Sequence, residues 1–301
     1  MDLLDHLAAR GYSFVTPTPL THARVVSRRM SHQARDLRDV FGWSLPFDPA
    51  HLAPAVMKLA EDAGVIAEGP HGLSSKVRVS TVHGRLFVHS AYPTDAPDSV
   101  FLGPDTYRFA DFIKQEVAGR SGVGRIVDIG AGAGVGGVVA GLAQPQASVT
   151  LSDINPLALR LAKINASHAG IDAIITCGSG LDPVEGKIDL ILANPPYIVD
   201  GKARAYRDGG GMHGAELSLT WTLDAARRLS KGGAMLLYTG SAIVGGRDAL
   251  REALCDALPD LGCSLCYREI DPDVFGEELE EAAYADVERI AAIGAVVVRE
   301  G

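Results

Sequence analysis

One stretch of the chain indicates the fold: Val127-Asp128-Ile129-Gly130-Ala131-Gly132-Ala133-Gly134-Val135-Gly136. The stretch leaves a short apolar run and enters a segment of helical character. Glycines at 130, 132 and 134 have no Cβ atom, so the backbone can turn tightly there and approach a ligand closely. The pattern G-x-G-x-G is a weak signal on its own, because it serves many nucleotide-like ligands and sometimes only a tight turn.

This stretch lies in a part of the chain where short apolar runs alternate with helical segments. The runs are rich in β-branched residues, and we predict strands at 125–129, 148–152, 173–177, 188–193 and 233–238. We predict helices between them at 135–143, 156–168 and 215–230. Two further strands are predicted in the tail, at 263–270 and 290–299. Such alternation predicts an α/β fold, with a mainly parallel sheet covered by helices on both faces.

Two more motifs follow predicted strands at the same edge of this sheet. Asp153 ends the second strand, where a carboxylate can accept hydrogen bonds from both hydroxyls of a ribose. Alternatively, Asp153 caps the helix that begins at Pro156. Asn194-Pro195-Pro196-Tyr197 follows the fourth strand, although two prolines can also form only a rigid turn. Open α/β sheets bind ligands at the carboxyl ends of their strands, so three motifs at that edge indicate a functional site.

From about residue 103 to 301, these motifs resemble those of class I S-adenosylmethionine-dependent methyltransferases of the branch with the N-P-P-Y signature. That branch includes protein glutamine N5-methyltransferases, ribosomal-RNA guanine N2-methyltransferases and DNA adenine methyltransferases. The resemblance implies a Rossmann-like sheet, S-adenosylmethionine as the cofactor and methyl transfer to a nitrogen atom. The chemistry requires no metal.

The resemblance also implies which residues contact the cofactor. These are Asp128, Gly130, Ala131, Gly132, Gly134, Asp153, Ile154, Ser179 and Asn194. The glycine-rich loop would hold the methionine part, Asp153 the ribose, and Ile154 would lie beside the adenine. The family often places an aspartate near the adenine amine. Here the segment reads Cys177-Gly178-Ser179-Gly180-Leu181-Asp182, so either Ser179 or Asp182 would make that contact.

The N-P-P-Y motif is expected to bind the methyl acceptor. An amide or aryl-amine nitrogen is a poor nucleophile because its lone pair is delocalised. The side-chain oxygen of Asn194 and the carbonyl of Pro195 could hold both N–H bonds and aim the lone pair at the methyl group. The rings of Pro195 and Pro196 fix φ and so pre-set these acceptors. Tyr197 would stack on the planar target and favour the positive charge that develops on nitrogen.

Two other segments resemble parts of such enzymes. The loop Tyr206-Arg207-Asp208-Gly209-Gly210-Gly211-Met212-His213-Gly214 is either a substrate lid or a flexible connection to the next helix. We expect His213 to be a solvated loop residue, because this chemistry needs no general base. Pro104-Asp105-Thr106-Tyr107 precedes the glycine-rich loop where related enzymes cover the cofactor.

The first hundred residues have a different organisation. We predict helices at 21–41 and from Asp48-Pro49 to Ala63, followed by a hairpin of 76–80 and 85–89 around His83-Gly84. Helices followed by a hairpin resemble a winged helix. The sequence therefore predicts a smaller N-terminal domain over 1–102, which would recognise the substrate, and a methyltransferase domain over 103–301.

Charge is distributed unevenly between these parts. Residues 1–110 carry 11 basic and 11 acidic side chains, so the remainder accounts for the whole net charge of −9. A strongly acidic chain is not a nonspecific nucleic-acid binder, but a local basic face could still bind phosphates. Arg24, Arg28 and Arg35 share a helical face by their spacing, near Arg29, Arg38, His22 and His32. The alternative is a solvated face that pairs partly with Asp36 and Asp39.

Composition excludes several other classes of protein. No apolar run approaches the ~18 residues that a membrane span needs. The first five residues carry acid where a secretion signal carries base, so we expect a cytoplasmic enzyme. Cys263 and Cys266 form a C-x-x-C, but no second pair follows at zinc-site spacing. Their alternation with Leu265 and Tyr267 is more typical of a half-buried strand.

These observations predict an S-adenosylmethionine-dependent N-methyltransferase that acts on a planar amide or aryl-amine nitrogen. We expect a macromolecular acceptor, either an RNA base or a protein glutamine. One alternative is a small-molecule N-methyltransferase whose first domain acts as a lid. The other is a non-catalytic, ligand-sensing winged-helix regulator. The intact Asn194–Tyr197 motif argues against the regulator, because a sensor has no use for a clamp on a target nitrogen.

Overall fold

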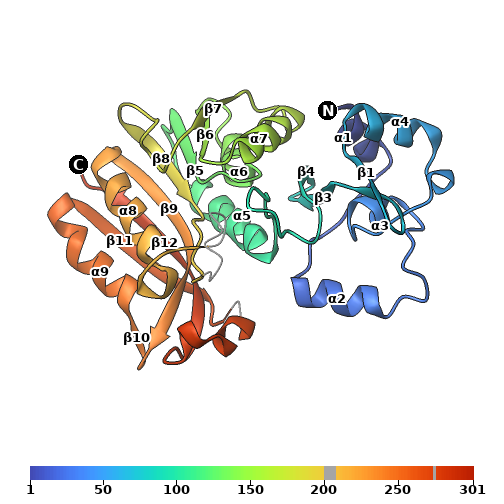
Figure 1. Ribbon diagram of the computed structural model, residues 1–301. Coiled ribbons are helices and arrows are strands. Elements are labelled where there is room, and N and C mark those ends of the chain that lie inside the picture. Colours follow the sequence, from blue (N-terminus) through green and yellow to red (C-terminus); the bar gives the residue numbers. More distant parts are fainter. Residues whose placement is uncertain (200–207, 274–275) are drawn as a thin grey trace.

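The computed structural model describes residues 1–199, 208–273 and 276–301, which form two lobes (Figure 1). The larger lobe is built on one sheet with the strand order β11-β12-β9-β8-β5-β6-β7. Its strands are β5 (Arg125–Ile129), β6 (Ser148–Asp153), β7 (Ala173–Cys177), β8 (Ile188–Ala193), β9 (Leu229–Val244), β10 (Arg247–Asp248), β11 (Cys263–Asp271) and β12 (Arg289–Arg299). Neighbouring strands from β5 to β9 are parallel, whereas β12 runs antiparallel to both β9 and β11.

Helices cover both faces of this sheet. They are α5 (Pro104–Val117), α6 (Val135–Ala143), α7 (Pro156–His168), α8 (Glu216–Arg228) and α9 (Ala249–Ala257). The strand register places Ile126 beside Leu190, on the face that packs against α5, α6 and α7. The next pair, Val127 and Ile191, faces α8 and α9. Both faces of the sheet are therefore buried, which explains why its strands read as continuous apolar runs.

The predicted α/β architecture of this lobe is confirmed. The helices predicted at 135–143 and 156–168 coincide with α6 and α7, and all seven predicted strands are present. Strand β9 is longer than the predicted 233–238, because it pairs with β12 from Ala234 to Ile243. Helix α8 consequently ends at Arg228 rather than at residue 230. Helix α9 was not predicted, and its side chains Leu250 and Leu254 pack under the sheet.

The smaller lobe consists of short helices and two hairpins. Its helices are α1 (Asp2–Ala9), α2 (Pro19–Ser27), α3 (Leu37–Phe41) and α4 (Pro54–Asp62), with a 3₁₀ turn at Pro49–His51. Its hairpins are β1 (Ile66–Gly69) with β2 (Gly72–Ser75), and β3 (Val77–Val82) with β4 (Arg85–Ser90). The predicted hairpin β3–β4 is confirmed, and its turn residues His83 and Gly84 have φ values of 46° and 74°. Two left-handed residues in succession suit the twist of a two-residue hairpin.

Two helix predictions in this lobe were wrong. The predicted helix 21–41 is broken between α2 and α3, where Ser31 Oγ accepts from the Gln33 amide and Asp36 Oδ1 from the Asp39 amide. These local bonds compete with helical ones. The helix expected from Asp48 begins only at Pro54, and Asp48 caps the 3₁₀ turn instead. A proline at 54 would remove a helical hydrogen bond and clash with the preceding turn of a longer helix.

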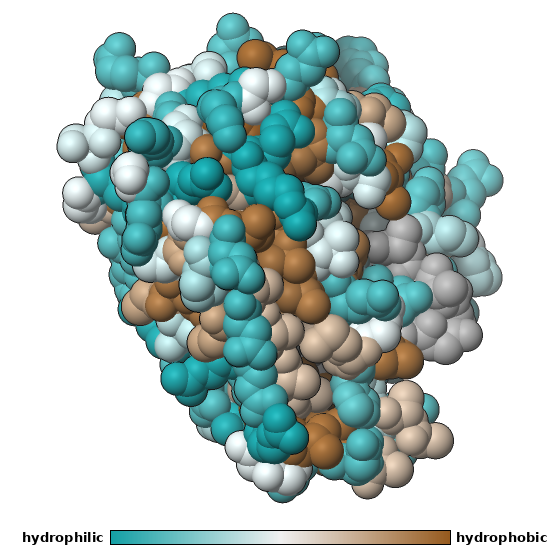
Figure 2. Space-filling view, turned by 90° about the vertical axis from the view of Figure 1, so that its left-hand side faces the viewer, coloured by the Kyte–Doolittle hydropathy of each residue, from teal (hydrophilic) through white to brown (hydrophobic). Residues whose placement is uncertain are grey.

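The end of the larger lobe that carries β11 and α9 is turned toward the viewer in Figure 2, where apolar residues form a strip between hydrophilic ones. Strand β11 is outermost in the sheet. Along it, Cys263 is buried, Leu265 and Tyr267 are half-buried, and Cys266 is exposed. The interpretation of the C-x-x-C as an alternating strand is confirmed, since its two thiols differ in exposure and both are free. Within the three described ranges, no helix is both long and apolar enough to cross a membrane.

Candidate active site

The glycine-rich loop joins β5 to α6 in a strongly left-handed path. Gly130, Gly132 and Gly134 have φ values of 64°, 53° and 77°, which disfavour any residue with a Cβ atom. The Ala131 amide donates to the Ser152 carbonyl at 2.9 Å, which holds the loop beside β6. Apart from its chain neighbours, a Cβ atom on Gly132 would meet no protein atom nearer than 4.0 Å. The loop therefore leaves open space above its middle glycine.

Asp153 lies at the end of β6 and supports this loop. Its Oδ2 accepts from the Gly132 amide at 2.9 Å, and its Oδ1 accepts from the Asn155 amide at 2.8 Å. Asn155 is the residue that caps α7, because its side chain accepts from the Leu157 amide at 2.9 Å. The alternative in which Asp153 caps that helix is therefore wrong. Burial raises the pKa of Asp153 above its ordinary value.

A second carboxylate, Asp128, lies beneath the loop. Its side chain is buried, and its Oδ2 accepts from the Gly137 amide in the first turn of α6 at 2.7 Å. Burial raises the pKa of Asp128 to about 7, and the negative charge of Asp153 adds to this effect. Asp128 thus holds the first turn of α6, which follows the loop, and Asp153 holds the loop itself at the end of β6.

The N-P-P-Y motif leaves β8 at the same edge of the sheet. Asn194 and Pro196 are half-buried, and Pro195 is buried. Throughout the part of the chain that the structure describes, the side-chain amide of Asn194 has no hydrogen-bond partner. This amide is therefore available to a ligand, as a target-binding residue requires.

The Tyr197 side chain is not positioned to stack on a target. The residue is only 6% exposed, and burial raises the pKa of its hydroxyl well above the ordinary value, with the negative charge of Asp105 in α5 adding to the effect. Its ring packs on β9, where a Cβ atom on Gly240 would lie 2.3 Å from Tyr197 Cδ2. Stacking on a target would require the ring to leave this position.

The chain that follows Tyr197 is held on two sides. The Gly209 amide donates to the Ile198 carbonyl at 2.9 Å, and the Val199 amide donates to the Tyr284 hydroxyl at 2.8 Å. A Cβ atom on Gly209 would lie 2.7 Å from the Pro196 carbonyl oxygen, so glycine is required for this approach. Residues 206 and 207 of the predicted loop lie outside the described residues, but the part from 208 onward forms a wall of the N-P-P-Y motif.

His213 in this wall is a partly exposed loop residue that contacts a carboxylate at the surface. Its Nε2 lies 3.1 Å from Asp286 Oδ1, and its side chain is 33% exposed. Met212 and His213 have φ values of 55° and 52°, which are uncommon for residues with side chains. Backbone strain of this kind is concentrated at functional sites.

The expected adenine side of the site is open. Ile154 is 55% exposed for a large apolar residue, and Ser179 and Asp182 are both exposed. The Asp182 amide donates to the Ser179 carbonyl at 3.0 Å, so the two residues share one turn. Either side chain is therefore available to a ligand there.

Sequence reasoning missed Trp221 of α8 at this site. A Cβ atom on Gly130 would lie 2.8 Å from Trp221 Cη2, and one on Gly180 would lie 3.1 Å from Trp221 Nε1. The half-buried indole thus lies against both loops. A tryptophan on a predicted amphipathic helix carries no signal that separates this position from an ordinary core position.

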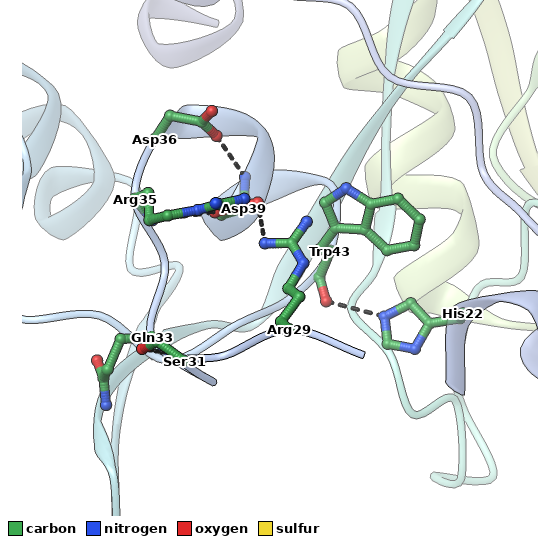
Figure 3. Close-up of polar contacts among 8 residues, drawn as sticks. All are labelled: His22, Arg29, Ser31, Gln33, Arg35, Asp36, Asp39 and Trp43. Atoms are coloured by element: carbon green, nitrogen blue, oxygen red, sulfur yellow. Dashed lines mark hydrogen bonds and ion pairs between the residues drawn. The ribbon is translucent and has the colours of Figure 1, made fainter. Parts of the chain in front are cut away.

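The predicted arginine face is not formed as the spacing suggested. Arg24 lies on α2 and Arg28 caps its end, but Arg35 lies beyond the break in the helix, so the three do not share one helical face. Figure 3 shows Arg29 and Arg35 directed at Asp39, with N···O distances of 2.5 and 3.2 Å. Pairing with Asp39 is therefore confirmed for these two arginines. Asp36 caps α3 instead of pairing.

Comparison with known proteins shows what part of the larger lobe is similar to. Residues 112–255 match the family model described as Methyltransferase small domain. This segment is similar to the methyltransferase small domain family. The matched segment contains the glycine-rich loop, Asp153 and the N-P-P-Y motif.

Curated proteins that resemble this chain include two kinds of methyltransferase. The chain is 34% identical over 157 residues to Release factor glutamine methyltransferase of Deinococcus radiodurans, which covers 51% of this chain and 55% of the relative. It is 36% identical over 74 residues to Ribosomal RNA small subunit methyltransferase C of Pseudomonas entomophila, covering 25% of this chain and 22% of the relative. The chain thus spans about half, or less, of the length of these relatives.

A solved structure supports the Rossmann-like fold. The crystal structure of Trm5b from Pyrococcus abyssi superimposes with a TM-score of 0.52 at 15% sequence identity, covering 75% of this chain and 56% of that chain. The larger lobe therefore has the Rossmann-like fold that its motifs predicted.

Proposed function

We propose that this chain is an S-adenosylmethionine-dependent N-methyltransferase. The observation that carries the proposal is the free, half-buried amide of Asn194, which lies at the same sheet edge as the glycine-rich loop in a methyltransferase small domain. A fold of this kind alone does not imply an activity. A target-binding amide next to an open glycine-rich loop does support a methyltransferase activity.

The residues present fit the cofactor. The space above Gly132 can take the methionine part, and Asp153 keeps lone pairs that can accept from ribose hydroxyls. We assign cofactor contacts to Asp128, Gly130, Ala131, Gly132, Gly134, Asp153, Ile154, Ser179 and Asn194. Ile154 offers an exposed apolar surface to the adenine. When bound, S-adenosylmethionine supplies an already activated methyl group.

The chain's own residues would then position the acceptor nitrogen. The Asn194 side-chain oxygen and the Pro195 carbonyl accept its two N–H bonds and so direct the lone pair toward the cofactor. The fixed φ angles of Pro195 and Pro196 hold both acceptors in place before the acceptor arrives. Such positioning suits an amide or aryl-amine nitrogen.

We infer that the acceptor is a macromolecule. The relatives named above are a release factor glutamine methyltransferase and a ribosomal RNA methyltransferase. These names point to a protein and to an RNA as acceptors, and a protein glutamine or an RNA base each offers a planar nitrogen that the Asn194 and Pro195 acceptors would suit. The N-terminal lobe over 1–102, which ends at the N-cap of α5, would contribute to recognition.

Radiolabelling and calorimetry test this function together. Purified protein is incubated with methyl-tritiated S-adenosylmethionine and with RNA, protein and small-molecule fractions of a cell extract. We expect label in the RNA or the protein fraction only. Calorimetry should show S-adenosylmethionine binding that Asp153→Ala weakens by about 1–3 kcal/mol, because ribose hydroxyls lose a buried acceptor. Binding of NAD without binding of S-adenosylmethionine would contradict the proposal.

A further inference from the structure

The indole of Trp221 reaches from the glycine-rich loop to the turn that follows β7. Its six-membered ring meets Gly130, where a Cβ atom would lie 2.8 Å from Trp221 Cη2. Its Nε1 meets Gly180, where a Cβ atom would lie at 3.1 Å. Gly130 and Gly180 have φ values of 64° and 51°, so both turns adopt a conformation that favours glycine. One side chain of α8 therefore borders two turns at the proposed cofactor site.

Trp221 can reach this position because the connection between β7 and β8 has no helix. Helices α6, α7 and α8 link the strand pairs β5–β6, β6–β7 and β8–β9, whereas residues 178–187, all of them described, join β7 to β8 without one. Trp221 packs against the buried cluster that includes Leu181 and Val184 of this connection. The indole therefore lies beside the turn at Gly180.

The indole is only partly used by this packing. Trp221 is half-buried, and its Nε1 donates to no acceptor in the described ranges of the chain. The atom is not among the buried polar atoms that lack a partner, so it is open to solvent. A buried indole N–H usually has a hydrogen-bond partner, and the group can only donate. A ligand at this turn could supply the missing acceptor.

The turn at Gly180 also lies next to the end of β6. The Gly178 amide donates to the Asp153 carbonyl at 3.1 Å, and Ser152 Oγ donates to the Gly180 carbonyl at 3.3 Å. Ile154, the residue after Asp153, exposes 55% of its surface. An exposed apolar side chain and a free aromatic donor thus border one turn. This combination suits a planar heteroaromatic ring that carries acceptor nitrogens.

We propose that Trp221 contacts the adenine ring of S-adenosylmethionine and contributes to the affinity for the cofactor. The inference rests on the proposed function and adds a residue of α8 to the contacts assigned above. The indole borders the ring, and its N–H donates to a ring nitrogen. A tryptophan that only fills space between α8 and the two turns would not respond to one half of the cofactor in preference to the other.

The first test uses the fluorescence of the indole itself. The chain has two tryptophans, so Trp43→Phe leaves Trp221 as the only one. Titration of this variant with S-adenosylhomocysteine should quench its fluorescence with the same Kd that calorimetry gives. Adenosine should also quench the fluorescence and methionine should not, because only adenosine carries the ring. The reverse variant Trp221→Phe keeps Trp43 in the smaller lobe, and its fluorescence should stay constant in all three titrations.

The second test measures affinity by calorimetry on variants that circular dichroism shows to be folded. Trp221→Leu should weaken the binding of S-adenosylhomocysteine by about 10-fold, because it removes both the aromatic surface and the donor. Trp221→Phe should have an intermediate Kd, since it retains an aromatic ring but no N–H. The control Trp43→Phe should bind like the wild type.

Three results would overturn the inference while the proposed function stands. They are binding of S-adenosylhomocysteine to Trp43→Phe without a change in fluorescence, equal responses to adenosine and methionine, and unchanged affinity in Trp221→Leu. Because the fluorescence test keeps Trp221 in place, it decides the question even if Trp221→Leu does not fold. If the wild-type chain binds neither S-adenosylmethionine nor S-adenosylhomocysteine, the proposed function is wrong and the inference is wrong with it.

Discussion

Asn165 of α7 exchanges two hydrogen bonds with the main chain of Val88 in β4. The Val88 amide donates to Asn165 Oδ1 at 2.8 Å, and Asn165 Nδ2 donates to the Val88 carbonyl at 2.9 Å. The same Nδ2 donates to the carbonyl of Ala133 at 2.9 Å. Since Ala133 belongs to the glycine-rich loop, one fully buried side chain ties the N-terminal lobe to the proposed cofactor site.

Replacing this side chain should therefore affect both lobes. Asn165→Leu leaves two carbonyls and one amide buried without their partner, so we expect the free energy of unfolding to fall by about 3–5 kcal/mol. Affinity for S-adenosylmethionine should fall as well, because the glycine-rich loop loses a support. Denaturant unfolding and calorimetry measure the two effects. The control Lys163→Leu introduces the same residue at an exposed position of α7 and should change neither quantity appreciably.

The buried carboxylate Asp128 predicts a pH dependence of stability. Its pKa of about 7 in the folded chain lies above the ordinary value of 3.8, so the folded chain retains a proton that the unfolded chain releases between these values. Stability without cofactor should therefore fall as pH rises from about 4 to 7, by on the order of 4 kcal/mol from this group. Asp128→Asn should flatten that slope. A slope that is equally steep in the variant would show that other groups cause it.

Asn194→Ala tests the acceptor clamp. Removing one positioned hydrogen-bonding group should lower turnover by on the order of 10²–10³. Affinity for S-adenosylmethionine should stay within a few-fold of the wild type, because the main partner of this amide is the acceptor nitrogen. Single-turnover labelling and calorimetry separate the two quantities. Near-normal turnover would mean that the motif serves only as a turn.

The exposed arginines of the N-terminal lobe give a test for an RNA acceptor. Arg24 and Arg28 are exposed, whereas Arg29 and Arg35 are committed to Asp39. If the acceptor is RNA, changing Arg24 and Arg28 together to alanine should raise its KM and flatten the salt dependence of KM. The control Lys58→Ala removes a charge that is 75% exposed and already paired with Asp62. A wild-type KM that is independent of salt would exclude phosphate contacts as the basis of recognition.

The fold of the larger lobe could be predicted because its signals are local. Apolar β-branched runs, the glycines of the loop and the cap at Asn155 each specify structure within a few residues. The smaller lobe was harder because competing local signals decided it. Asp48 and Asp36 are both good N-caps, but Pro54 delayed one helix and the bonds of Ser31 and Asp36 broke the other. The alternation of charged and apolar residues did not reveal these breaks.

The positions of the site residues could be predicted only where a local sequence motif determines them. The positions of Asp153 and Asn194 follow from the strands that they end. The burial of Tyr197 does not, because its ring packs against Gly240, which comes from a strand distant in the sequence. Tertiary packing buries the Tyr197 ring that was expected to stack on a target. No sequence pattern near Tyr197 indicates this burial.

The continuous apolar core limits how the two lobes of this chain could be exchanged with those of other proteins. Side chains from α1 and the β3–β4 hairpin, such as Leu7 and Phe87, belong to the same buried cluster as Ile113 of α5 and Ala162 of α7. In a chimaera with a different lobe before residue 103, the buried apolar side chains of the larger lobe would therefore lose their packing partners and be exposed to solvent. A change of specificity is therefore easier to engineer by substitution on the surface of the smaller lobe than by exchange of the whole lobe.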